Sequence, residues 1–150
     1  MGTKIPLVDL KLQHERLRKE IHKAVDEVID VNKLIKGPIL KKFEDNFANF
    51  TGKKYCIGVK SGSSDLHLVF HALGIKYGDV VITTSHTFIG TTEQLWQLGA
   101  EVKFVDINEK TYNIDVNKIE DAITEKTKAI VPVHLYGNPC DMDVIYDIAN

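Results

Sequence analysis

The chain has 150 residues, which is about the length of one domain. Its 43% hydrophobic and 27% charged residues are typical of a soluble globular protein. The formal charge of -2 excludes the strongly basic surface of a nucleic-acid-binding protein, and no apolar run is long enough to span a membrane. The start of the chain lacks the apolar core of a signal peptide, so we expect a cytoplasmic protein with Cys56 and Cys140 as packed thiols.

Two helices are predicted in the first third of the chain. From Lys11 to Val31, apolar residues recur with a helical period and leave a charged opposite face. Gly37-Pro38 then interrupts the chain, and a second helix with Leu40 on its apolar face ends near Gly52. We therefore expect residues 1–50 to form an amino-terminal helical segment.

Strands and helices alternate four times in residues 51–150, without a hairpin signal. This pattern predicts an α/β fold with a mainly parallel sheet flanked by helices. In such sheets, ligands bind at the carboxyl ends of the strands. The predicted strands are Tyr55–Val59, Val80–Thr83, Glu101–Val105 and Ala129–Val133, and the predicted helices are Leu66–Leu73, Gly90–Leu98, Val116–Ile123 behind an Asp115 cap, and a last one that starts at Asp141. The loops at the carboxyl ends are Ser61–Ser64, Ser85–Phe88, Asp106–Tyr112 and His134–Pro139.

The turn Ser61-Gly62-Ser63-Ser64 is the most informative of these loops, because it stands between a predicted strand and a predicted helix. Free backbone N–H groups and the positive end of the helix dipole favour an anion there, and a phosphate group is the expected ligand. Serine is also an ordinary helix N-cap, so the turn has a purely structural alternative. The spacing excludes both a Walker loop and a Rossmann glycine fingerprint.

Aromatic residues follow two of the other strands. Phe88 lies beyond the second strand, where it is either a platform for a flat heterocycle or a core residue. The nearby His86 is only a weak candidate for catalysis. His134 and Tyr136 follow the last strand, where they either contact a substrate or anchor the loop.

Three further residues offer chemistry that we consider less well supported. His67 and His71 lie four residues apart on a helix, but no third ligand is evident, so we expect no metal site. Lys60 stands beside the serine turn, where a lysine could form a Schiff base with a cofactor. It lies on the strand side of the turn, however, and the alternative is that it simply faces solvent.

The last predicted helix begins with Asp141-Met142-Asp143, and its apolar stripe reaches the end of the chain at Asn150. We therefore expect the chain to be part of a longer protein.

Together these motifs resemble the amino half of the DegT/DnrJ/EryC1/StrS sugar aminotransferases. The resemblance runs from Ile5-Pro6 to the last residue, and the number of matching pieces in the same order makes it specific. The matching pieces include Gly37-Pro38, Gly78-Asp79-Val80-Val81-Ile82, Thr87-Phe88, Phe104-Val105-Asp106-Ile107, Thr111-Tyr112-Asn113-Ile114-Asp115, His134-Leu135-Tyr136-Gly137 and Asp141-Met142-Asp143.

The resemblance implies an aspartate-aminotransferase-like (PLP fold type I) large domain that binds pyridoxal 5'-phosphate. Ser63 and the backbone of Ser64 would hold the cofactor phosphate, with Gly62 allowing its close approach, and Phe88 would stack on the pyridine ring. His134 and Tyr136 would lie near the cofactor or the sugar, and no metal is implied. Residues 51–150 would be a partial, truncated cofactor domain, and the small domain would be absent.

The resemblance also implies the reaction, which is amino transfer, usually from glutamate, to a keto group on a nucleotide-linked sugar. The family's Schiff-base lysine and the aspartate at the pyridine nitrogen belong beyond Asn150, so no catalytic residue is expected within residues 1–150. Members work as homodimers with shared sites, for amino-sugar and polysaccharide biosynthesis. The alternatives are a sugar 3-dehydratase of the same fold and a non-catalytic module for phosphate binding or dimerisation.

The sequence departs from the family pattern at the serine turn. Ser64-Asp65-Leu66 stands where the family has Asp-Ala-Leu, and His67 replaces a common apolar residue. Thr84 stands where a proline often precedes the Thr-Phe loop. These differences concern the fine positioning of the site rather than the class of enzyme.

Overall fold

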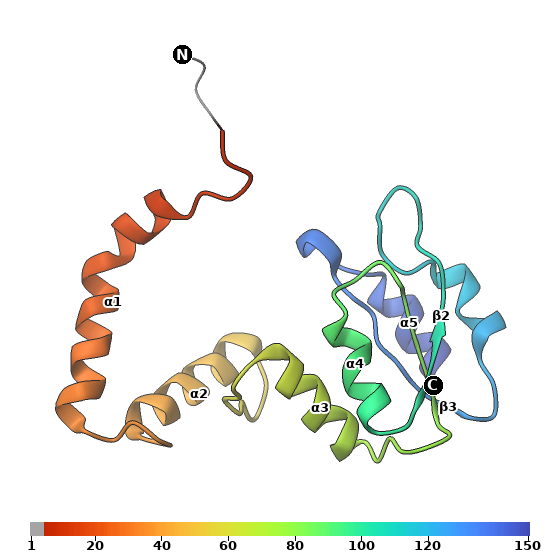
Figure 1. Ribbon diagram of the computed structural model, residues 1–150, viewed down its shortest axis with the longest axis horizontal. Helices are drawn as coiled ribbons and strands as arrows, with labels where there is room; N and C mark the ends of the chain where they lie inside the picture. The colour runs from red at the N-terminus through yellow and green to blue at the C-terminus, as the bar shows by residue number, and fades with distance from the viewer. Residues whose placement is uncertain (1–4) are drawn as a thin grey trace. The chain divides into compact units, whose positions relative to one another are not determined.

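A computed structural model describes residues 5–150 (Figure 1). These residues form two compact units. One unit extends to Gly58 and the other comprises Val59–Asn150, whereas the sequence suggested a division after residue 50. The start of the chain was predicted not to be a signal peptide. Residues 1–4 of that segment lie outside the described residues.

The first unit contains the two predicted helices, α1 (Lys11–Val31) and α2 (Pro38–Thr51). Each helix ends at a left-handed residue, Asn32 with φ 50° and Gly52 with φ 67°, which releases the chain from the helical path. Pro38 is the first residue of α2, where its missing N–H has no helical partner to lose.

Both helices of this unit keep their apolar stripes exposed. No residue of α1 is buried, and in α2 only Ala48 is. The phenylalanines of α2 form a row with ring centroids 5.8 and 6.2 Å apart. The exposed apolar residues include Leu17, Ile21, Val25 and Ile29 in α1, and Phe43, Phe47 and Phe50 in α2.

The prediction of a strand at Tyr55–Val59 is wrong for the described structure. These residues have no strand partner among residues 5–150, and Tyr55 and Ile57 are exposed. A high β-propensity reflects a fit to a half-buried pleated surface, so without a neighbouring strand it does not produce one. The segment is fixed instead by a hydrogen bond of 2.8 Å from the Gly58 amide to the Glu44 carboxylate.

The second unit contains a parallel sheet of three strands in the order β2-β1-β3. β1 (Val80–Thr83) is central and buried along its whole length, as its apolar sequence predicts. It pairs in parallel with β2 (Glu101–Phe104) and with β3 (Thr127–Ile130). The carboxyl ends of all three strands therefore lie at one edge.

The two faces of this sheet carry separate cores, because successive strand residues point to opposite faces. Val81 belongs to the core under α3 (Gly62–Ala72) and α4 (Gly90–Gln97), and Ile82 belongs to the core under α5 (Met142–Ala149). The buried members are Phe70, Ile75, Val81, Leu95 and Ala100 on one face, and Ile82, Val105, Ile114, Ile119, Ala122, Cys140 and Ile145 on the other. This confirms the expected α/β architecture with helices on both faces.

The predicted helix at Val116–Ile123 is wrong in type. The segment forms two 3₁₀ turns, η1 (Val116–Lys118) and η2 (Glu120–Ala122), behind the predicted Asp115 cap. Ile119 and Ala122 are both buried and lie three residues apart, which is the period of a 3₁₀ helix. The shorter repeat thus places both side chains in the core.

The last strand is displaced from its predicted position at Ala129–Val133, since β3 comprises Thr127–Ile130. Val131 still donates its amide to the carbonyl of Ile82 at 2.8 Å. The next residue, Pro132, has no N–H to continue the ladder, which ends the pairing there.

No helix within residues 5–150 is long and apolar enough to cross a membrane. Both cysteines are free: Cys140 is buried, as predicted, and Cys56 is partly buried. Burial raises the pKa of the Cys140 thiol, whose Sγ donates to the carbonyl of Val133 at 3.2 Å.

Replacing Ile82 by Ala should lower the free energy of unfolding by about 2–5 kcal/mol, because the side chain is fully buried between the sheet and α5. Ile123→Ala is the matched control, since that isoleucine is 42% exposed. Urea denaturation measures both changes. Equal effects of the two substitutions would contradict the assignment of Ile82 to the core.

Candidate functional site

The first turn of α3 is the predicted anion site, and its hydroxyl groups have two different roles. Ser61 is the N-cap: its Oγ accepts from the Ser64 amide at 3.3 Å and lies 3.1 Å from the Ser64 hydroxyl. The structural alternative thus holds for Ser61 and Ser64. Within residues 5–150, the Ser63 hydroxyl and the amides of Gly62 and Ser63 have no hydrogen-bond partner. These three donors remain available to a ligand.

Phe88 and Ser63 converge on the start of α4. A Cβ atom placed on Gly90 would lie 2.7 Å from Cε1 of Phe88 and 2.9 Å from Oγ of Ser63. The hydroxyl and the ring are therefore close neighbours, and only a glycine leaves the space between them open. Phe88 is 73% exposed, so it is not a core residue.

The loops after the three strands bring together three aromatic side chains, His86, Tyr112 and Tyr136. Their ring centroids lie 6.0 to 6.2 Å apart, which is contact distance for aromatic pairs. The Tyr136 hydroxyl lies 3.3 Å from Nε2 of His86. We call these three residues the aromatic triangle.

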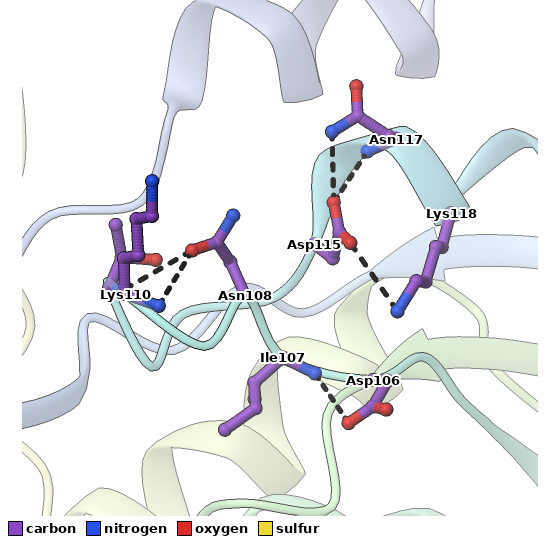
Figure 2. Close-up of polar contacts among 8 residues, drawn as sticks. Asp106, Ile107, Asn108, Lys110, Asp115, Asn117 and Lys118 are labelled. Carbon is purple, nitrogen blue, oxygen red and sulfur yellow. Dashed lines mark hydrogen bonds and ion pairs between the residues drawn. The ribbon is translucent and has the colours of Figure 1, made fainter.

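The loop that carries Tyr112 is closed upon itself (Figure 2). An isolated bridge joins Ile107 to Ile114 at its base. Inside the loop, Oδ1 of Asn108 accepts from the amides of Lys110 and Thr111 at 2.9 and 3.3 Å. These bonds fix the loop before any ligand binds.

The same loop is anchored at its far end by the Asp115 cap (Figure 2). Oδ1 of Asp115 accepts from the backbone and the side chain of Asn117, and Oδ2 pairs with Lys118 at 3.5 Å. The Asn117 side-chain bond is the main reason that the pKa of this carboxyl lies below its ordinary value.

Asn113 joins this loop to the one that carries Tyr136. The side chain is 4% exposed, and its Nδ2 donates to the carbonyls of Asn138 and Pro139, each at 3.0 Å. Its Oδ1 accepts from the Leu135 amide at 3.2 Å. All three bonds of the Asn113 side chain are to backbone, so Asn113 sets the position of one loop relative to the other.

His134 has the structural role that was one of its two interpretations. Its Nδ1 accepts from the Cys140 amide at 3.0 Å, which holds the loop and leaves Nε2 free to donate. Tyr136, by contrast, is 79% exposed.

Other candidate residues are not brought into this group. Lys60 is exposed, as expected. His67 is partly buried, with an Nδ1 that has no partner within the described residues, and His71 is exposed. No cluster of potential metal ligands occurs in residues 5–150.

Sequence reasoning undervalued His86, Tyr112 and Asn113. One available signal was the presence of an aromatic residue in each loop that follows a strand of the sheet. That signal does not say whether the rings meet, because their positions depend on the left-handed backbone of Tyr112 (φ 61°) and Tyr136 (φ 57°).

Comparison with known proteins identifies the group to which this geometry belongs. The profile of the DegT/DnrJ/EryC1/StrS aminotransferase family matches residues 15–150. The chain belongs to this family. This confirms the resemblance inferred from the sequence, and with it the fold class.

Individual relatives are similar over almost the whole chain. A pleiotropic regulatory protein of Geobacillus stearothermophilus is 44% identical over 97% of the chain. The UDP-2-acetamido-2-deoxy-3-oxo-D-glucuronate aminotransferase of Pseudomonas aeruginosa is 42% identical, also over 97%. The crystal structure of S. venezuelae DesV superposes with a TM-score of 0.94 at 38% identity, over 99% of the chain. The chain spans about 40% of the length of these relatives.

A dehydratase has the same fold. The E. coli GDP-4-keto-6-deoxy-D-mannose-3-dehydratase, solved with bound hydrated PLP, superposes with a TM-score of 0.80 at 38% identity. The match covers 85% of this chain and 34% of the dehydratase. Membership of the family therefore does not by itself distinguish the two reactions.

Replacing Gly90 by Ala should separate Phe88 from Ser63, because the new methyl group would occupy the space between them. The ring is exposed and the hydroxyl can rotate, so the free energy of unfolding should change by less than about 1 kcal/mol. NMR measures the separation as a loss of the nuclear Overhauser effect between the Phe88 ring and the Ser63 β protons. Gly62→Ala is the matched control and should preserve this signal, because a Cβ atom at Gly62 would meet open space. Absence of the nuclear Overhauser effect from the unsubstituted protein would contradict the geometry.

Proposed function

We propose that a full-length protein containing this chain is a pyridoxal-phosphate-dependent aminotransferase. It would transfer an amino group, with glutamate as donor, to a keto group on a nucleotide-linked sugar, for amino-sugar and polysaccharide biosynthesis. The observation that carries the proposal is the convergence of the Ser63 hydroxyl and the Phe88 ring on Gly90, beside free amides of α3. Family membership and the name of the aminotransferase relative support the reaction.

The residues present fit the phosphate end of this cofactor. A phosphate dianion needs several donors, and the amides of Gly62 and Ser63 with the Ser63 hydroxyl offer three at the positive end of a helix of 11 residues. The Ser64 amide is within 3.3 Å of Ser61 Oγ, so it would share its hydrogen with that cap. Ser63 is thus the main side-chain ligand in this proposal, with Gly62 and Ser64 contributing backbone.

The ring end fits as well. Phe88 offers an exposed aromatic face next to Ser63, and the missing side chain of Gly90 leaves room between them. When bound, pyridoxal phosphate supplies the electron sink that amino transfer requires. Phe88 would orient the flat ring and exclude water from one side of it.

We place the groups that move protons outside residues 1–150. Amino transfer needs a protein amine that moves a proton at the substrate carbon, and a carboxylate that keeps the ring nitrogen protonated. The relatives are about 2.5 times as long as the chain, which leaves ample sequence for both. Lys60 is exposed and lies before the N-cap of α3, and we assign it no role in the reaction.

On the substrate side, we propose that Tyr136 and His134 contact the sugar nucleotide. Tyr136 supports this by its exposure at the carboxyl edge of the sheet. His134 uses Nδ1 to hold its own loop, so only Nε2 would face a substrate.

A cytoplasmic homodimer is the proposed form of the protein. Its two thiols form no disulfide, as expected in a reducing compartment. The exposed apolar stripe of α1 suits a surface that a second subunit covers.

A sugar 3-dehydratase is the second candidate, supported by the similarity to the E. coli dehydratase. The two enzymes differ in their product. Incubation of the full-length protein with glutamate and a nucleotide-linked keto-sugar should give 2-oxoglutarate and a sugar with an amine in place of the ketone, which mass spectrometry detects. Loss of water from the sugar would favour the dehydratase. Absence of any reaction over a panel of keto-sugars would favour the non-catalytic module.

Replacing Ser63 by Ala in the full-length protein should weaken pyridoxal phosphate binding about five- to thirtyfold, the scale of one hydrogen bond to a charged group. Equilibrium dialysis measures the dissociation constant. Ser85→Ala is the matched control, since Ser85 is an exposed serine at the same edge of the sheet. Unchanged affinity in Ser63→Ala would show that the phosphate binds elsewhere.

A further inference from the structure

The three residues of the aromatic triangle hold a defined arrangement, although they lie in exposed loops. Each of its members comes from a different loop, yet the rings are in contact. Tyr112 and Tyr136 both have left-handed backbones, with φ 61° and 57°, a conformation that side chains other than those of Gly, Asn and Asp seldom adopt. The surrounding structure must therefore impose these positions.

The restraints that impose them are visible. Asn113, next to Tyr112, is buried and holds the backbone of the Tyr136 loop with three hydrogen bonds of 3.0 to 3.2 Å. The bridge between Ile107 and Ile114 closes the Tyr112 loop. The triangle is therefore built in advance, which lowers the entropy lost when a ligand binds.

The three residues of the triangle nevertheless remain accessible to a ligand. Tyr136 is 79% and Tyr112 is 48% exposed. Their rings offer apolar faces, while the phenol hydroxyls and Nε2 of His86 offer polar groups at the same place. This combination matches a sugar ring, which has apolar C–H faces and a polar rim.

We propose that the aromatic triangle of His86, Tyr112 and Tyr136 binds the sugar ring of the nucleotide-linked substrate; this inference rests on the proposed function. His86 precedes Phe88 by two residues in one loop. A substrate that reacts beside Phe88 must present its sugar there, because the sugar carries the keto group. The nucleotide then lies further from the triangle.

The test compares two half-reactions in the full-length protein. The double substitution Tyr112→Leu and Tyr136→Leu should raise KM for the nucleotide-linked keto-sugar about tenfold, a loss typical of aromatic contacts. Conversion of the bound cofactor by glutamate, followed by absorbance, should change less than about twofold, because the donor lacks the sugar. Tyr146→Leu, which replaces an exposed tyrosine of α5, is the matched control and should leave both unchanged.

Two results would overturn the inference. An equal loss in the glutamate half-reaction would mean that the tyrosines only maintain the loops. A weaker affinity for a nucleoside diphosphate that carries no sugar would mean that the triangle binds the nucleotide. Failure of the proposed function is distinguishable, because then the unsubstituted protein would form no amino sugar from the nucleotide-linked keto-sugar.

Discussion

The parallel pairing of β1 with strands on both sides is the constraint on which the site depends. Because β2 and β3 run in the same direction as β1, all three release their loops at one edge. Burial of the whole central strand stabilises this arrangement, and a hydrogen bond of 2.8 Å from the Thr83 hydroxyl to the carbonyl of Val131 extends the contact beyond the last paired residues. Residues far apart in the chain, such as His86 and Tyr136, meet only for this reason.

At that edge, the proposed cofactor site depends on the different roles of three neighbouring serines. The hydroxyls of Ser61 and Ser64 lie within hydrogen-bond distance of each other, and Ser61 caps the start of α3. The hydroxyl of Ser63 is therefore left for a ligand. Gly90 contributes by having no side chain, so the free hydroxyl and the Phe88 ring approach the same space. A helix start that caps itself and still keeps two free amides is well suited to an anion.

Sequence alone predicted the parts of this structure that local rules determine. β1 is an apolar run between turns, and the Asp115 and Asp141 caps follow from residue type. The prediction of a strand at residues 55–59 was wrong because a strand needs a neighbouring strand, and no local pattern reveals whether one is present. The candidate anion site at the serine turn could be proposed from the sequence, because its residues are contiguous. The aromatic triangle could not be, because it depends on left-handed backbone at two tyrosines and on contacts between distant loops.

A crystal structure of the full-length protein with pyridoxal phosphate would test the central claim most directly. The account predicts the phosphate within about 3 Å of the Ser63 hydroxyl and of the Gly62 and Ser63 amides, with Phe88 against the pyridine ring. A phosphate held away from the first turn of α3, or a Phe88 ring that does not touch the cofactor, would contradict it.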